Sequence, residues 1–280
     1  MSGSECFGII AKDVYAYKKG DLLMFTRERN IEVTNFDIYT PKLPAGSALK
    51  IALISDLHSY MYRNEQDSIL SLIFSQSPDI ALLAGDIVDE KISERGAYVF
   101  AQKLAPRIPS FYVTGNHEYR RDDVPKIKED MARFGIKVLT NEYVRLNVSG
   151  CEFILAGLDD ESGYESAELW LEDAKKALEP LKAERLAKIL LLHKPHMARY
   201  FAGYGFDAAL SGHTHGGQIR TPFKKRGLYS SGQGLFPELS EGEYDVDGLK
   251  LIISRGLAIE RHLLRLFNPQ QLVIVTLMGK

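Results

Sequence analysis

Two histidines stand one residue apart in the stretch SGHTHGGQ, residues 211–218, directly after the apolar residues FDAAL. A buried imidazole needs polar partners, and the surrounding glycines weaken any regular helix or strand. Residues of the same chemical kind follow short apolar runs elsewhere in the chain. The full set is Asp56, His58, Asp86, Asn116, His117, His193, His213 and His215. Imidazole, carboxylate and amide groups in such places predict a metal-binding site.

Each of these residues has an ordinary structural explanation when it is taken alone. An Asp after a strand is usually a turn residue or a helix N-cap, as Asp86 would be, and a lone histidine is usually hydrogen-bonded. However, five of the seven histidines follow apolar runs, and only His196 and His262 do not. One metal site accounts for all five positions, whereas the structural explanation needs five separate coincidences.

The chemistry of the set also selects the metal. It contains no thiolate, which excludes a cysteine-type zinc site, and it is too rich in nitrogen for calcium. Imidazole with carboxylate and amide oxygens suits Mn, Fe, Zn, Co or Ni. Two ions sharing a bridging carboxylate would clamp the oxygens of a displacement at phosphorus, and bound water would ionise near neutrality. Seven candidate ligands suit such a pair better than one ion: Asp56, His58, Asp86, Asn116, His193, His213 and His215.

The elements that must position these residues follow from the hydrophobic pattern. Short aliphatic runs predict buried strands, and stretches 65–76, 91–104 and 122–134 predict helices between the first of them. This alternation favours parallel strands, whose carboxyl ends bind ligands in open α/β sheets. Later segments joined by the turns VSGC and DVDGLK predict hairpins, so mixed sheets are expected. The predicted buried runs end at Ser55, Ala84, Thr114, Leu192 and Leu210.

Composition sets the class of protein. The chain has 280 residues, 45% of them hydrophobic, which is enough for a sizeable core. A net charge of −2 argues against nucleic-acid binding through a bulk positive field. The two cysteines, Cys6 and Cys151, form no disulfide framework, and no apolar run approaches the length of a membrane span. The N-terminus lacks the pattern of a secretory signal, so a cytoplasmic location is expected.

The motifs together resemble the five-block signature of calcineurin-like metallophosphoesterases. The blocks are Asp56-x-His58, Gly85-Asp86-x-x-Asp89, Gly115-Asn116-His117-Glu118, His193 and Gly212-His213-x-His215. The stretches GHTHGGQIR, GLYSSGQGLFP and LIISRGLAIERHLLRLFNPQQLVIVTL are similar to the bacterial branch of small, often membrane-associated phosphodiesterases. The resemblance implies an α/β fold, a four-layer α-β-β-α sandwich with two mixed β-sheets. We expect residues 1–45 to form an N-terminal segment with one strand and residues 46–280 to form the metallophosphoesterase domain.

The resemblance also implies roles for single residues. Asp56, His58 and His215 match ligands of a first ion, and Asn116, His193 and His213 match ligands of a second, with Asp86 as the bridge. His117 matches a histidine that contacts phosphate and protonates the leaving group; the alternative is that it orients Asp56 or Asp86. Glu118 and Asp89 are expected to be loop residues near the ligands.

Two further strand ends carry candidate substrate residues. Arg255 follows KLIIS, and its guanidinium can donate paired hydrogen bonds to phosphate oxygens. Asp159 follows FILAGL at a similar place. We therefore expect a phosphodiesterase with two Mn, Fe or Zn ions that hydrolyses a small or lipid-linked phosphodiester or pyrophosphate through a metal-bound hydroxide. The resemblance to membrane-associated phosphodiesterases also implies peripheral contact with a membrane. The alternatives are a phosphomonoesterase or protein phosphatase, and an inactive scaffold protein.

Overall fold

The computed structural model describes residues 31–221, 224–230, 233–258 and 265–280, and these residues contain two six-stranded sheets. The first sheet has the order β1-β16-β2-β3-β4-β5. Its strands are β1 (Glu32–Thr40), β16 (Gln271–Gly279), β2 (Ala48–Ile54), β3 (Ile80–Ala84), β4 (Ser110–Val113) and β5 (Lys137–Val138). The second has the order β14-β15-β9-β8-β7-β6. Its strands are β14 (Gly242–Val246), β15 (Leu249–Ile253), β9 (Ala208–Ser211), β8 (Ala187–Leu191), β7 (Cys151–Gly157) and β6 (Glu142–Val148).

Both sheets are mixed, as the sequence predicts. In the first sheet β2, β3, β4 and β5 run parallel, while β16 runs antiparallel to β2 and parallel to β1. In the second sheet β15, β9, β8 and β7 run parallel. The two predicted hairpins are confirmed, because β6 pairs antiparallel with β7 and β14 pairs antiparallel with β15.

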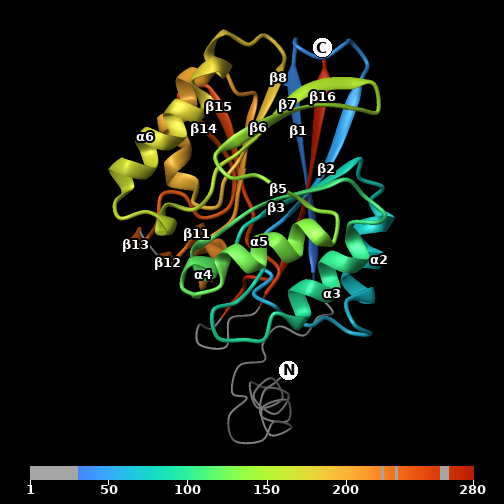
Figure 1. Ribbon diagram of the computed structural model, residues 1–280, viewed down its shortest axis with the longest axis vertical. Helices are drawn as coiled ribbons and strands as arrows, with labels where there is room; N and C mark the ends of the chain where they lie inside the picture. The colour runs from blue at the N-terminus through green and yellow to red at the C-terminus, as the bar shows by residue number, and fades with distance from the viewer. Residues whose placement is uncertain (1–30, 222–223, 231–232, 259–264) are drawn as a thin grey trace, which may run out of the picture.

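Alternating side chains hold the four layers together. In β2, Leu49, Ile51 and Leu53 point into the core between the sheets, whereas Ala52 and Ile54 face the helices. This period of two follows from the pleat of a strand that is buried on both faces. Figure 1 shows α6 (Ala167–Leu178) outside the second sheet and α2 (Asp67–Ser75) and α3 (Arg95–Leu104) outside the first.

The outer helices bury one apolar face each. α5 (Val124–Arg133) packs with α2 and α3 on the first sheet through Ile127 and Met131. α6 packs on the second sheet through Trp170, Ala174 and Leu178. The expected α-β-β-α sandwich is therefore confirmed. The other helices of the described residues are α4 (Asn116–Tyr119), η2 (Glu161–Gly163), η3 (Glu179–Ala183), η4 (Pro195–Tyr204) and η5 (His215–Gly217), and all but η4 have five residues or fewer.

The loop after β9, residues 212–218, carries His213 and His215, and we call it the second histidine loop. Two small antiparallel pairs of strands follow it. They are β10 (Arg220–Thr221) with β11 (Lys224–Gly227), and β12 (Tyr229–Ser230) with β13 (Gly234–Leu235). Within the described ranges, no helix has the length and apolar character needed to cross a membrane. Most of the expected N-terminal segment, residues 1–30, lies outside the described residues.

Candidate metal centre

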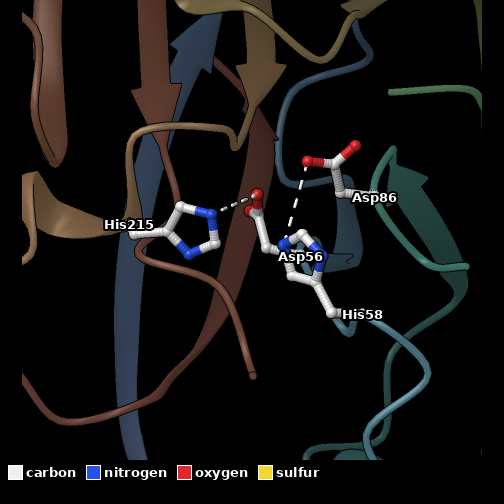
Figure 2. A group of neighbouring side chains, drawn as sticks. All are labelled: Asp56, His58, Asp86 and His215. Atoms are coloured by element: carbon white, nitrogen blue, oxygen red, sulfur yellow. Dashed lines mark ion pairs between the residues drawn. The ribbon is translucent and has the colours of Figure 1, made fainter. Parts of the chain in front are cut away.

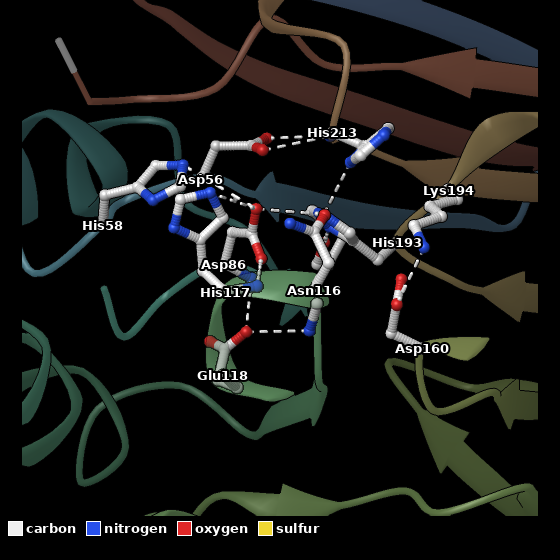
Figure 3. Close-up of polar contacts among 12 residues, drawn as sticks. Asp56, His58, Asp86, Asn116, His117, Glu118, Asp160, His193, Lys194 and His213 are labelled. Carbon is white, nitrogen blue, oxygen red and sulfur yellow. Dashed lines mark hydrogen bonds and ion pairs between the residues drawn. The ribbon is translucent and has the colours of Figure 1, made fainter. Parts of the chain in front are cut away.

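Strand ends from both sheets bring the predicted ligand residues together. Asp56 and His58 follow β2, Asp86 follows β3, and Asn116 begins α4 just after β4. From the second sheet, His193 follows β8, while His213 and His215 follow β9. These strands run parallel within each sheet, so their carboxyl ends share one edge. Figure 3 shows most of the side chains converging there.

Five of the seven predicted ligands lie in the left-handed region of the backbone. Their φ angles are 52° for Asp56, 47° for His58, 52° for Asp86, 73° for His213 and 49° for His215. A non-glycine residue in this region costs about 1–3 kcal/mol and persists only where its surroundings hold it. The loops are therefore strained to aim these side chains inward.

One group of ligand atoms joins Asp56, His58, Asp86 and His215, all buried and within 4.8 Å of one another. His215 Nε2 lies 3.5 Å from Asp56 Oδ1. His58 Nε2 lies 3.8 Å from Asp86 Oδ2. Figure 2 shows the two imidazoles approaching the carboxylates from different loops. Two nitrogens and two carboxylates at this spacing suit one transition-metal ion.

A second group joins Asp86, His193 and His213, again within 4.8 Å. His193 Nε2 lies 3.1 Å from Asp86 Oδ2 and 3.2 Å from Asn116 Oδ1. His213 Nδ1 lies 3.1 Å from the same nitrogen of His193. Asn116 thus joins this group, and Asp86 belongs to both of these buried groups. A third group, of His58, Asp89 and His117, is less buried and does not include Asp86.

Hydrogen bonds behind the imidazoles set their orientation. His193 Nδ1 lies 2.8 Å from the carbonyl oxygen of Ala84, an acceptor, so it carries the ring proton in neutral His193. The lone pair of Nε2 then points at Asp86. His58 Nδ1 lies 3.2 Å from Asp89 Oδ2, an ion-pair contact on the corresponding nitrogen. Such partners on the outer nitrogen are the usual support for metal-binding histidines.

The electrostatics of the group favour a cation. Burial would raise the pKa of Asp86, but His193, His58 and His117 lower it well below its usual value. Burial also disfavours charge on His193, yet Asp86 raises the pKa of His193 to about 10. A carboxylate that stabilises a proton on a neighbouring nitrogen also stabilises a metal cation on that nitrogen. The donor set therefore fits the ions that the sequence predicts.

His117 lies at the mouth of the group rather than within it. Its backbone N–H donates to Asp86 Oδ1 at 2.8 Å, while its Nε2 is 4.0 Å from Asp86 Oδ2. Its Nδ1 lies 3.6 Å from Asp89, and its ring meets that of His58 edge-on, with 4.4 Å between centroids. Arg120 Nη1 approaches Nε2 to 3.0 Å. The ring is partly exposed and is placed to meet a ligand.

Glu118 has a larger structural role than the sequence indicates. Its buried carboxylate accepts four backbone N–H groups, those of Asp86, Ile87, Val88 and Gly115, at 2.8–3.0 Å. Burial and the Asp86 carboxylate raise the pKa of Glu118, and the N–H groups oppose that rise. Glu118 thus ties the loop after β3 to the loop after β4. Its place beside Asn116-His117 is the only sequence signal for this role.

Close approach between loops depends on two glycines. A Cβ on Gly115 would lie 2.2 Å from Asp86 Oδ1, and one on Gly212 would lie 2.4 Å from Asp56 Oδ2. Since real atoms do not approach so closely, any side chain there would push a candidate ligand out of place.

The structure does not bring the two predicted substrate residues into the ligand groups. Arg255 is buried, with Nη1 3.1 Å from Glu241 and Nη2 2.7 Å from Glu32. Asp159 accepts a hydrogen bond from the Thr114 hydroxyl at 2.8 Å and pairs with Lys128. Both charges are already paired in the structure, and a role of either residue in substrate binding stays a prediction. A strand-end position alone does not show which way a side chain points.

The comparisons with known proteins agree with this geometry. The sequence matches the family model of calcineurin-like phosphoesterases over residues 49–217. An uncharacterized metallophosphoesterase of Aquifex aeolicus is 31% identical over 257 residues, covering 89% of this chain and 93% of its own. One of Campylobacter jejuni is 32% identical over 254 residues, covering 89% of this chain and 64% of the relative, so it is longer.

A solved structure supports the fold. The NAD nucleotidase of Haemophilus influenzae superposes with a TM-score of 0.50 at 16% identity, covering 75% of this chain and 45% of the nucleotidase. The fold and the site thus define a metallophosphoesterase, a phosphoric ester hydrolase. The chain belongs to the calcineurin-like phosphoesterase family.

The Glu118 contacts generate the first prediction. Glu118→Ala leaves four buried N–H groups without their acceptor, at about 1–3 kcal/mol for each group left unsatisfied. We expect the free energy of unfolding to fall by at least about 3 kcal/mol, measured by urea denaturation. Glu129→Ala is the control, because Glu129 is exposed and forms a surface ion pair with Arg133. Equal stability of the two variants would contradict the role of Glu118.

Proposed function

We propose that the protein is a dinuclear metal-dependent phosphodiesterase acting on a small or lipid-linked phosphodiester or pyrophosphate. The observation that carries the proposal is the position of Asp86, whose carboxylate belongs to the two fully buried groups of ligand atoms. A carboxylate in that position can bridge two ions a few ångströms apart. Two-ion sites of this kind serve displacement at phosphorus.

The residues divide between the two positions. Asp56, His58 and His215 would hold one ion, and Asn116, His193 and His213 the other, with Asp86 shared. Mixed nitrogen and oxygen ligands suit Mn, Fe or Zn. When bound, such ions supply Lewis acidity that activates water and stabilises negative charge on phosphate oxygens. The protein's own part is to hold the donors in place and to exclude most solvent from them.

His117 is the residue that we assign to the leaving group. It stands beside the ligand atoms, is partly exposed, and is backed on its Nδ1 side by Asp89 at 3.6 Å. An imidazole in this position can give a proton to the departing ester oxygen as the bond to phosphorus breaks. The alternative role, orienting Asp86, would act through the ring, whose Nε2 lies 4.0 Å from Asp86 Oδ2. The 2.8 Å bond from the His117 backbone N–H does not distinguish the two roles, because any residue except proline would keep it.

Two other functions compete with this proposal. A phosphomonoesterase or protein phosphatase would use the same ligands, so the geometry alone does not separate it from a diesterase. An inactive scaffold is disfavoured because all seven candidate ligands and His117 are present and lie close together. Activity on matched diesters and monoesters decides among the three. The division of the chain near residue 45 and the cytoplasmic location also stay predictions.

The test begins with metal content and one variant. We expect the purified protein to contain about two transition-metal ions per chain and to hydrolyse bis-p-nitrophenyl phosphate faster than p-nitrophenyl phosphate. Asp86→Asn removes the charge that both ions share, so both ions should bind more weakly. The value of kcat/KM should fall at least about 100-fold.

The control for this variant is Asp67→Asn, which changes an exposed carboxylate in the first turn of α2 that forms a surface ion pair with Lys103. It should keep its metal and its activity. A folded wild-type protein that stays free of metal when offered Mn, Fe and Zn would refute the dinuclear proposal. Faster turnover of monoesters would refute the diesterase assignment alone.

The role of His117 predicts a dependence on the leaving group. His117→Ala should keep its ions and lose about 10²–10⁴-fold in kcat/KM on an alkyl phosphodiester, because a basic alkoxide needs a proton. On a nitrophenyl diester the loss should be under about 10-fold, since nitrophenolate leaves unaided. Both substrates are measured on preparations of known metal content. Equal losses together with lost metal would assign His117 to ligand orientation instead.

We also propose peripheral membrane contact through an apolar rim beside the site, defined as Leu235, Phe236 and Phe267. These side chains are 67%, 68% and 68% exposed, and both phenylalanines have left-handed φ angles of 56° and 54°. Phe236 N–H bonds to Leu228, whose own N–H bonds to Gly217 beside His215. Leu266, the neighbour of Phe267, bridges to Ile219. An exposed apolar patch commonly marks a contact surface, and the proposal takes these three side chains as one patch.

The rim predicts binding to lipid vesicles. Changing all three residues to Ser should weaken co-sedimentation with phosphatidylcholine–phosphatidylglycerol vesicles at least about 10-fold, because buried apolar area sets such affinity. Leu169→Ser is the matched control, since Leu169 is 49% exposed on α6. Activity on a soluble diester should not change. Vesicle binding that survives the triple change would remove the rim from the proposal.

A further inference from the structure

Asn268 holds the second histidine loop from behind. This buried side chain donates from Nδ2 to the carbonyl oxygen of His215 at 2.6 Å and to that of Gln218 at 3.1 Å. The two carbonyls enclose η5, the short turn that carries His215. The family match ends at residue 217, so it assigns no role to Asn268.

The loop needs such a partner because its backbone is unusual. His215, Gly216 and Gln218 have φ angles of 49°, 63° and 61°. A Cβ on Gly216 would lie 2.7 Å from Asn268 Oδ1, so the amide is pressed directly against the turn. The two hydrogen bonds from Asn268 reach the carbonyls at both ends of this strained turn and so hold its conformation. The direction of the His215 ring follows from that conformation.

A second residue of the same segment reinforces the contact. Arg265 is buried, with Nη2 3.2 Å from His215 Nδ1 and 2.5 Å from the carbonyl oxygen of Arg255. The segment then leads directly into β16 of the first sheet, and Leu266 bridges to Ile219. The C-terminal segment therefore fastens a loop of the second sheet to a strand of the first.

The two ligand groups differ in their dependence on this contact. His215 belongs only to the group with Asp56 and His58. His193 is held separately by the Ala84 carbonyl, and the backbone N–H of His213 donates to Asp56 at 3.0 Å. Within the part of the chain that the structure describes, Asn268 forms its hydrogen bonds with the His215 and Gln218 carbonyls and with neither of these histidines. Loss of the Asn268 bonds should thus act on one group more than on the other.

We propose that Asn268 is a positioning residue for His215 and thereby sets the affinity of the ion held by Asp56, His58, Asp86 and His215. The inference rests on the proposed function, because it assumes an ion in each group. Asn268 touches neither the ion nor the substrate. It acts by fixing the carbonyls on both sides of the turn, so that the His215 ring keeps its direction.

The test is a Co²⁺ titration of metal-depleted full-length protein, followed by visible absorption and equilibrium dialysis. Partners of this kind typically contribute 10–100-fold to metal affinity. Asn268→Ala should weaken one binding step by about that factor and leave the other within about 3-fold. Asn268→Asp keeps the shape but removes the donors, so it should show the same selective loss, and it serves if the alanine variant does not fold.

Asn141→Ala is the matched control. Asn141 is also a buried amide and donates to Tyr164 at 2.6 Å and Asp173 at 2.8 Å, away from the ligand atoms. It should lower Tm of the metal-free protein without changing either Co²⁺ step. Equal weakening of both steps by Asn268→Ala, or two unchanged steps, would overturn the positioning role. Wild-type protein that binds no Co²⁺ would instead overturn the proposed function, and this inference with it.

Discussion

The position of the Asp86 carboxylate is the constraint on which the site depends. One of its oxygens accepts the backbone N–H of His117 at 2.8 Å, and the other lies 3.1 Å from His193 Nε2. His117 lies in a loop of the first sheet, and His193 follows the end of β8 in the second sheet. Asp86 therefore joins the two sheets at the edge where the ligand groups form. A shift of this one side chain would change both groups.

The surroundings of Asp86 are rigid for identifiable reasons. Glu118 accepts four backbone N–H groups from the two loops that flank it, and Gly115 allows those loops to touch. Below the loops, apolar clusters fill the space between the sheets and under the helices on each side. Left-handed backbone at the ligand residues costs free energy, and this packing offsets it. The strained loops are therefore part of a preorganised site, whose side chains are in position before a ligand binds.

Such prior arrangement matters for chemistry at phosphorus. Buried carboxylates and imidazoles in fixed positions need little reorganisation when charge develops on phosphate oxygens. The same burial makes the site sensitive to supporting residues that never meet the substrate. Glu118 supports it from the first sheet, whereas Arg265 and Asn268 approach it from the C-terminal segment before β16. The two sheets thus contribute support as well as ligands.

The sequence alone determined the family, the fold class and most of the candidate site. Aliphatic runs predict buried strands, and the polar residues after them share an edge because parallel strands end together. The candidate ligands can therefore be located from the sequence, and their roles stay predictions. The tertiary structure decided which polar side chains face that edge. Arg255 pairs with Glu32, 223 residues away in sequence, and Asn268 reaches His215 across 53 residues. Partners of this kind depend on how the sheets pack, and no pattern along the chain encodes that distance.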